Sequence, residues 1–98
     1  MSLSLYRKQQ STKQLLVELD YDNPTVNLFL EKVGKESGLY IDYYGDTVLY
    51  LTHLKALRDA AQQLMNKNHS EIMNFYRIIC DILKEGIPPG VSYIFVGD

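Results

Sequence analysis

The sequence lacks the features that identify several large classes of protein. Its one cysteine, Cys80, cannot form an internal disulfide or a cage of cysteine ligands around a metal, so no oxidising compartment is implied. No apolar run is long enough to cross a bilayer, and the first residues do not resemble a signal peptide. We therefore expect a cytoplasmic protein that has no membrane partner.

Motifs of catalysis and of nucleic-acid binding are also missing. The sequence contains no nucleophile elbow, no phosphate-binding loop and no set of cysteine ligands, which favours a non-enzymatic protein without a cofactor. The net charge is −2, and only the segment 1–14, with Arg7, Lys8 and Lys13, carries bases without acids. A nucleic-acid-binding protein normally needs a basic surface that displaces counterions, so we do not expect nucleic acid as a partner.

What the chain does contain is the composition of a small globular protein. Its 98 residues, of which 46% are hydrophobic, predict a single α+β domain over residues 1–98. Residues 1–12 are expected to form either an edge strand or a flexible N-terminus. A chain of this length buries only a thin core, and this favours a stabilising partner such as a second subunit.

The first half of the chain alternates between strand and helix patterns. Hydrophobic alternation over 14–21 predicts a strand, with Leu15, Val17 and Leu19 on one face. Asn23 and Pro24 are suited to the start of a helix, whose apolar positions follow at helical spacing. Those positions are Val26, Phe29, Leu30 and Val33. The pair of glycines Gly34 and Gly38 brackets the end of this helix.

Residues 39–52 are predicted to form a β-hairpin. A three-residue loop, Tyr43-Tyr44-Gly45, would place Gly45 in the left-handed conformation that such loops require. The register that follows from this loop separates two sets of side chains. Leu39, Ile41, Leu49 and Leu51 share one face, and Tyr40, Asp42, Val48 and Tyr50 share the other.

The second half predicts a helical element in two pieces, followed by a last strand. The first piece has its apolar stripe between Leu54 and Met65, and the second runs from Ser70 to a stop at Gly86. Residues 91–96 are largely apolar, as expected of a central strand. The resulting order, βαββαβ, is that of ferredoxin-like folds, with a four-stranded antiparallel sheet and helices on one face.

Three acidic residues form a first candidate site. Asp20 and Asp22 end the first predicted strand and Asp46 lies at the hairpin tip, and the ferredoxin-like order would bring these ends together. The segments 19–23 and 43–46 resemble the two metal-binding motifs of polymerase and cyclase palm domains. That resemblance implies that the three aspartates bind a divalent cation such as Mg²⁺, or a nucleotide, although Thr47 stands where the second motif usually has another acid.

The second candidate site is an interface. Tyr40, Val48 and Tyr50 are predicted to lie on the sheet face opposite the helices, and tyrosine is favoured in subunit interfaces. The helix from Glu71 to Glu85 is apolar almost all round, so its residues Phe75 and Ile78 are either part of the core or in contact with another chain. The leading hypothesis is a non-enzymatic interaction domain that pairs with itself, as a homodimer, or with another protein. The alternatives are a reduced palm-like domain and a small-metabolite-sensing regulatory domain.

Overall fold

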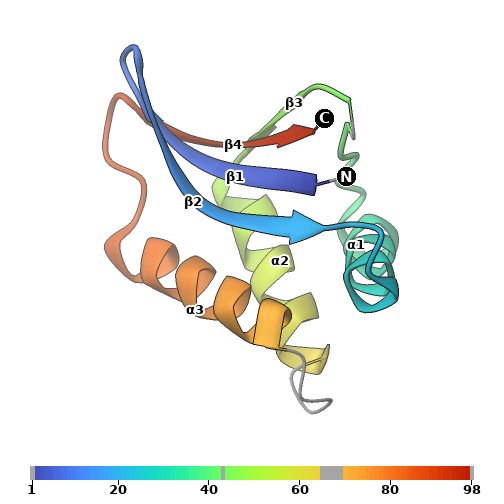
Figure 1. Ribbon diagram of the computed structural model, residues 1–98. Helices are drawn as coiled ribbons and strands as arrows, with labels where there is room; N and C mark the ends of the chain where they lie inside the picture. The colour runs from blue at the N-terminus through green and yellow to red at the C-terminus, as the bar shows by residue number, and fades with distance from the viewer. Residues whose placement is uncertain (1, 43, 65–69, 98) are drawn as a thin grey trace.

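Four strands form a single antiparallel sheet, and three helices lie together against one of its faces (Figure 1). The structure, a computed structural model, describes residues 2–42, 44–64 and 70–97. The strands are β1 (Ser2–Gln9), β2 (Thr12–Asp20), β3 (Asp46–Leu49) and β4 (Val91–Gly97), in the order β2-β1-β4-β3. The helices are α1 (Pro24–Ser37), α2 (Leu51–Leu64) and α3 (Ser70–Glu85). The predicted α+β class, with helices on one face and the second helical element in two pieces, is confirmed.

The N-terminal segment forms a full strand in the interior of the sheet, whereas the sequence suggested at most an edge strand. Leu3 and Leu5 are fully buried toward the helices, and the alternate residues Ser4 and Tyr6 face the other side. A tight turn connects β1 to β2, with Gln10 in the left-handed conformation at a φ of 55°. The sheet therefore obtains two of its four strands from residues 2–20, and the chain order is ββαβααβ.

Residues 39–42 are not part of a strand, so the predicted hairpin over 39–52 is wrong. Leu39 and Ile41 are buried and Tyr40 is exposed, as the alternation predicted, but this extended segment contributes to the core without joining the sheet. A strand and an extended segment outside the sheet show the same hydrophobic pattern, because burial of alternate side chains does not require a ladder of backbone hydrogen bonds. Leu51 also departs from the prediction, since it begins α2 and is exposed.

The loop before β3 is organised by Asp42. The backbone N–H of Asp42 donates to Thr47 Oγ1 at 2.9 Å, and the N–H of Tyr44 donates to Asp42 Oδ1 at 2.9 Å. Gly45 does not adopt the predicted left-handed conformation. A Cβ at this position would lie 2.6 Å from Asp42 Oδ2, so a larger residue here would require the Asp42 carboxylate to shift. Tyr43, the first residue of the predicted loop, lies outside the described residues.

The first helix begins and ends as its sequence predicts. Asn23 accepts a hydrogen bond from the N–H of Thr25, Pro24 occupies the first turn, and Gly38 closes the helix at a φ of 71°. The predicted stripe of α1 is the buried one: Val26, Phe29, Leu30 and Val33. None of the helices in the described ranges is both long and apolar enough to pass through a membrane.

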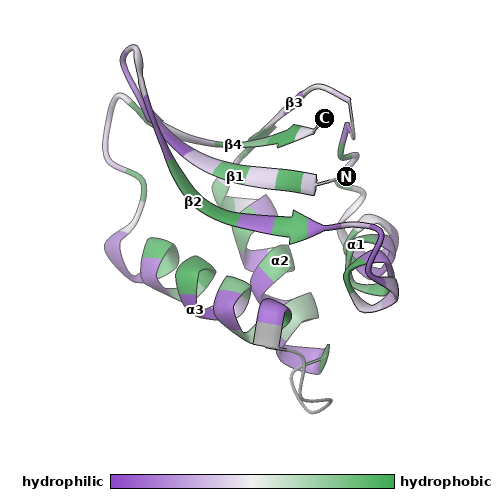
Figure 2. Ribbon diagram, in the orientation of Figure 1, coloured by the Kyte–Doolittle hydropathy of each residue, from purple (hydrophilic) through white to green (hydrophobic). Residues whose placement is uncertain are grey.

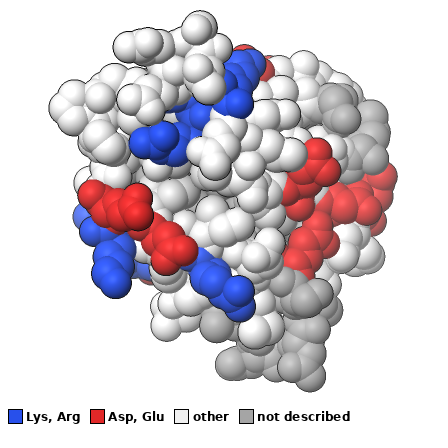
Figure 3. All heavy atoms as spheres, turned by 60° about the vertical axis from the view of Figure 1, so that its left-hand side comes forward, with Lys and Arg blue, Asp and Glu red and all other residues white. Residues whose placement is uncertain are grey.

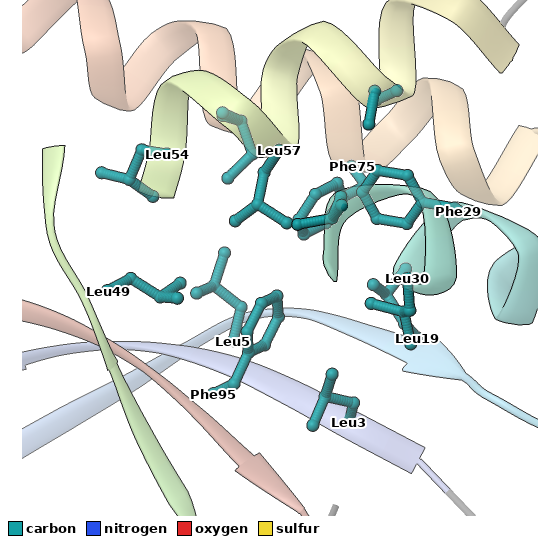
Figure 4. Close-up of a cluster of buried hydrophobic side chains, with 14 of the residues drawn as sticks. Leu3, Leu5, Leu19, Phe29, Leu30, Leu49, Leu54, Leu57, Phe75 and Phe95 are labelled. Carbon is teal, nitrogen blue, oxygen red and sulfur yellow. The ribbon is translucent and has the colours of Figure 1, made fainter. Parts of the chain in front are cut away.

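The core fills the space between the sheet and the helices (Figure 4). Phe75 of α3 stands at its centre, with its ring centroid 5.4 Å from that of Phe29 and 6.0 Å from that of Phe95. Hydrophobic residues recur in every helix and strand, whereas the tip of the β1–β2 hairpin is hydrophilic (Figure 2). The core thus joins all three helices to the sheet through residues from both ends of the chain.

A β-bulge in β2 changes which face of the sheet its side chains point to. The pairing register shifts between Leu5 and Tyr6, because Leu5 pairs with Val17 whereas Tyr6 pairs with Leu15, which leaves Leu16 as the extra residue. Val17 and Leu19 face the core as predicted, but Leu15 lies on the opposite face beside Tyr6 and is 48% exposed. Bulges bend and twist a ribbon, and the hairpin turn does rise away from the helices (Figure 1).

Candidate functional site

The three aspartates of the proposed metal site do not come together. Asp20 is at the end of β2 and Asp46 at the start of β3, and these strands form the two opposite edges of the sheet. Three strand spacings separate the edges, or about 14 Å. The expected convergence depended on β2 and β3 being neighbours, but β1 and β4 lie between them. Within the described ranges, no group of three or more His, Cys, Asp or Glu side chains is arranged to hold a metal ion.

Asp20 instead organises the turn that leads into α1. Its Oδ1 accepts a hydrogen bond from the N–H of Asp22 at 3.0 Å, and its carbonyl oxygen accepts one from the N–H of Asn23 at 3.1 Å. Glu71, in the first turn of α3, accepts from the N–H of Asp20 at 2.9 Å and from Asn23 Nδ2 at 3.3 Å. Part of the acidic pattern therefore has a structural explanation, because it anchors the β2–α1 turn to α3.

Removal of this anchor should cost measurable stability. We expect Glu71→Ala to lower the free energy of unfolding by about 1–2 kcal/mol, because two hydrogen bonds to a carboxylate are lost. The control is Glu31→Ala, which removes only the exposed ion pair with Lys35 and should cost about 0.5 kcal/mol or less. Urea denaturation followed by circular dichroism measures both. Equal losses in the two variants would contradict the anchoring role of Glu71.

The two predicted interface residues of α3 do not form an exposed surface. Phe75 is fully buried at the centre of the core, so its assignment to an interface is wrong. Ile78 is half-buried and packs against the same core, in a shallow depression that Leu16 also lines. The wide apolar stripe of α3 is explained by its position, because the helix packs against α2 as well as against β2. The core alternative that the sequence left open therefore accounts for this helix.

The predicted tyrosine face is divided between the sheet and its flanking loops. Only Val48 belongs to a strand, and it is 45% exposed on the face opposite Leu49. Tyr40 lies in the segment before β3, and Tyr50 lies between β3 and α2, where its N–H donates to His53 Nδ1. Both tyrosines are highly exposed, at 84% and 64%. The structure thus keeps Val48 on the helix-free face but does not place the two tyrosines in the sheet.

The register instead defines a row of apolar side chains that crosses all four strands. Leu15 pairs with Tyr6, Tyr6 with Ile94, and Ile94 with Val48, and cross-strand partners point to the same face. We call these four residues the apolar row, and the helix-free side of the sheet the open face. The outer members, Leu15 and Val48, are about half exposed, whereas Ile94 between its neighbours is nearly buried at 5%.

Two other features of the surface offer little chemistry. On α3, a hydrogen bond with Cys80 raises the pKa of Tyr76, so this phenol remains protonated at neutral pH and is not an activated base. A depression between α1 and the end of α2, lined in part by Leu28, Lys32 and Leu64, is open to solvent. Neither feature assembles a nucleophile with a base.

Three of the four residues in the apolar row, all except Val48, were not predicted from the sequence to lie on this face. Leu15 was assigned to the wrong face because a bulge is not visible in the alternation pattern. Tyr6 and Ile94 were missed because the segment around Tyr6 was not placed in the interior of the sheet, although Leu3 and Leu5 alternate with Ser4 and Tyr6. The chain matches no protein family, curated protein or solved structure among those with which it was compared. The site must therefore be interpreted from its own geometry.

Proposed function

We propose that this protein is a non-enzymatic interaction domain that forms a homodimer through the open face of its sheet. The observation that carries the proposal is the apolar row, which crosses the face that no described helix covers. An antiparallel sheet that is solvated on one side usually places polar residues there. Here the two outermost positions of the row, Leu15 and Val48, are aliphatic and about half exposed.

Physical arguments support a second sheet as the partner of this face. Two sheets can pack face to face about 10 Å apart, and their inner side chains then interdigitate. Tyr6 supplies the aromatic side chain that such interfaces favour. A face of four strands is smaller than the ~800 Å² that a stable complex typically buries on each partner. We therefore expect a weak, reversible dimer.

The palm-like alternative is not supported by the geometry, because its three aspartates lie on opposite edges of the sheet. The metabolite-sensing alternative would need a cleft between the sheet and the helices. The core side chains fill most of that space (Figure 4), and the depression that Arg7 and Leu16 form with Ile78 of α3 is shallow and open to solvent. Dimerisation through the open face requires neither arrangement. It also covers two of the exposed apolar side chains, Leu15 and Val48.

Sedimentation equilibrium tests the proposal directly. Over loading concentrations from about 1 μM to 1 mM, the weight-average mass should rise from the 11.3 kDa of one chain toward twice that value. Amide chemical shifts that change with concentration should cluster at Tyr6, Leu15 and Val48 and not on α3. A mass that stays at 11.3 kDa at the highest concentration would reject homodimerisation. Shifts confined to α3 would reject the open face as the interface.

A further inference from the structure

The charges on the open face form two rows, one on each side of the apolar row. On one side, Ser4 pairs with Glu18 and with Val96, and Val96 pairs with Asp46. Ser4 Oγ lies 3.5 Å from Glu18 Oε1, which agrees with the two side chains lying on the same face of the sheet. We call this set the acidic row.

On the other side, toward the hairpin turn, Lys8 pairs with Lys13 and with Ser92. The Nζ of Lys13 lies 5.9 Å from the centroid of the Tyr6 ring, which shows that Lys13 points to the open face. These residues form the basic row. Figure 3 views the molecule from the side that lies at the left of Figure 1, and there Lys and Arg side chains lie near the top, while further groups of both signs lie lower down and at the right.

From this pattern we infer how the two copies are oriented, an inference that rests on the proposed homodimer: the two-fold axis runs along the apolar row, so that the acidic row of each copy lies over the basic row of the other. A homodimer of this kind uses the same surface patch on both subunits. Two open faces can be stacked about an axis in the plane of the sheet in two simple ways. The axis either follows the apolar row or follows the strands.

The two orientations bring different charges together. With the axis along the apolar row, each strand lies over its own copy in the opposite direction, so Glu18 meets the other copy's Lys13. With the axis along the strands, β2 lies over β3, so Glu18 meets the other copy's Asp46. Each contact occurs twice because of the symmetry. Opposite charges across an interface guide and stabilise association, whereas like charges are costly, and this favours the first orientation.

The shape of the hairpin supports the same orientation. The β1–β2 hairpin bends away from the helices near its turn, toward the open side (Figure 1). The basic row lies in this bent part, with Lys8 and Lys13 two residues or fewer from the ends of their strands. In the first orientation the bend therefore carries the basic row toward the acidic row of the second copy.

Charge reversal at Glu18 and Lys13 tests the orientation. Both side chains belong to exposed residues, so the variants should fold, and circular dichroism of each variant checks this. We expect Glu18→Lys to raise the dimer dissociation constant at least tenfold, because the introduced ammonium group would then meet Lys13 of the other copy, and Lys13→Glu to act similarly against Glu18. The double variant should return to within about threefold of the original value. An equimolar mixture of the two single variants should form a heterodimer of similar affinity.

Each alternative gives a different result. If the axis runs along the strands, Glu18→Lys strengthens the dimer by pairing with Asp46, and Lys13→Glu has little effect. Either of these results overturns the inferred orientation but leaves the homodimer intact. A wild-type chain that stays monomeric instead rejects the proposed function itself. The tenfold weakening in the single variants should decrease at 0.5 M NaCl, since salt screens exposed charges, with a Debye length of about 4 Å.

Discussion

Replacement of Phe75 by alanine is expected to remove a large share of the stability of this protein. Its side chain is fully buried and lies between Phe29 and Phe95, so it connects α3 both to α1 and to β4. Truncation of a buried phenylalanine typically lowers the free energy of unfolding by about 3–5 kcal/mol, through lost transfer energy and the cavity that remains. The free energy of unfolding of a small domain is only about 5–15 kcal/mol in total. The urea midpoint of the variant should therefore lie well below that of the original protein.

Two further variants serve as a control and as a milder truncation of the same side chain. Met73→Ala changes the same helix at a position that is 41% exposed and should cost about 0.5 kcal/mol or less. Phe75→Leu leaves a smaller cavity and should cost less than half as much as alanine, which keeps the effect measurable if Phe75→Ala does not fold. Urea titrations at one fixed protein concentration compare all three, because dimerisation would otherwise shift the midpoint. A loss of under ~1 kcal/mol for Phe75→Ala would mean that this ring is not central to the core.

The predictable part of the fold is the part that local chemistry specifies. Asn23, Pro24 and Gly38 satisfy the free backbone groups at the two ends of α1, and these residue types perform that role in most helices. The periodic apolar stripes of the helices were correct for the same reason, because one side of each helix faces a common core. These features depend on residues close together in the chain.

Strand pairing was less predictable, because it depends on partners far apart in the chain. The turn between β1 and β2 uses Gln10 in the left-handed conformation, where a glycine or asparagine would have signalled a hairpin. Residues 39–42 show the alternation of a strand but have no place in the sheet, since β1 and β2 complete it from the other side. Because β1 joins the sheet and residues 39–42 do not, β2 pairs with β1 and not with β3. The three aspartates of the predicted metal site therefore do not meet.

In the candidate interface, too, local features were predictable and long-range ones were not. Val48 was correctly placed on the helix-free face, because alternation within a short strand fixes the facing of its side chains. Phe75 was wrongly placed, because an apolar helix gives no indication of how many of its sides the core will cover. The apolar row is a property of the register between four strands, one of which contains a bulge. No single segment of the sequence carries that information.

The test with the largest expected effect on association replaces both ends of the apolar row, as Leu15→Lys and Val48→Lys together. Both residues lie on edge strands, β2 and β3, where lysine is well tolerated, and both are about half exposed in the single chain. The monomer should therefore remain folded. In a symmetric dimer the two changes would bury four ammonium groups against an apolar surface, so the dissociation constant should rise at least ~100-fold.

The matched control is Tyr40→Ser with Tyr50→Ser, which removes two large exposed side chains that lie outside the strands. Both double variants change two exposed apolar residues, but only the first changes the apolar row. Sedimentation equilibrium should show a monomer for the first and a nearly unchanged dissociation constant for the second. The reverse result would transfer the interface from the open face to the exposed tyrosines beside β3. Loss of the dimer in both would mean that the interface extends from the row, past Val48, across the edge of the sheet.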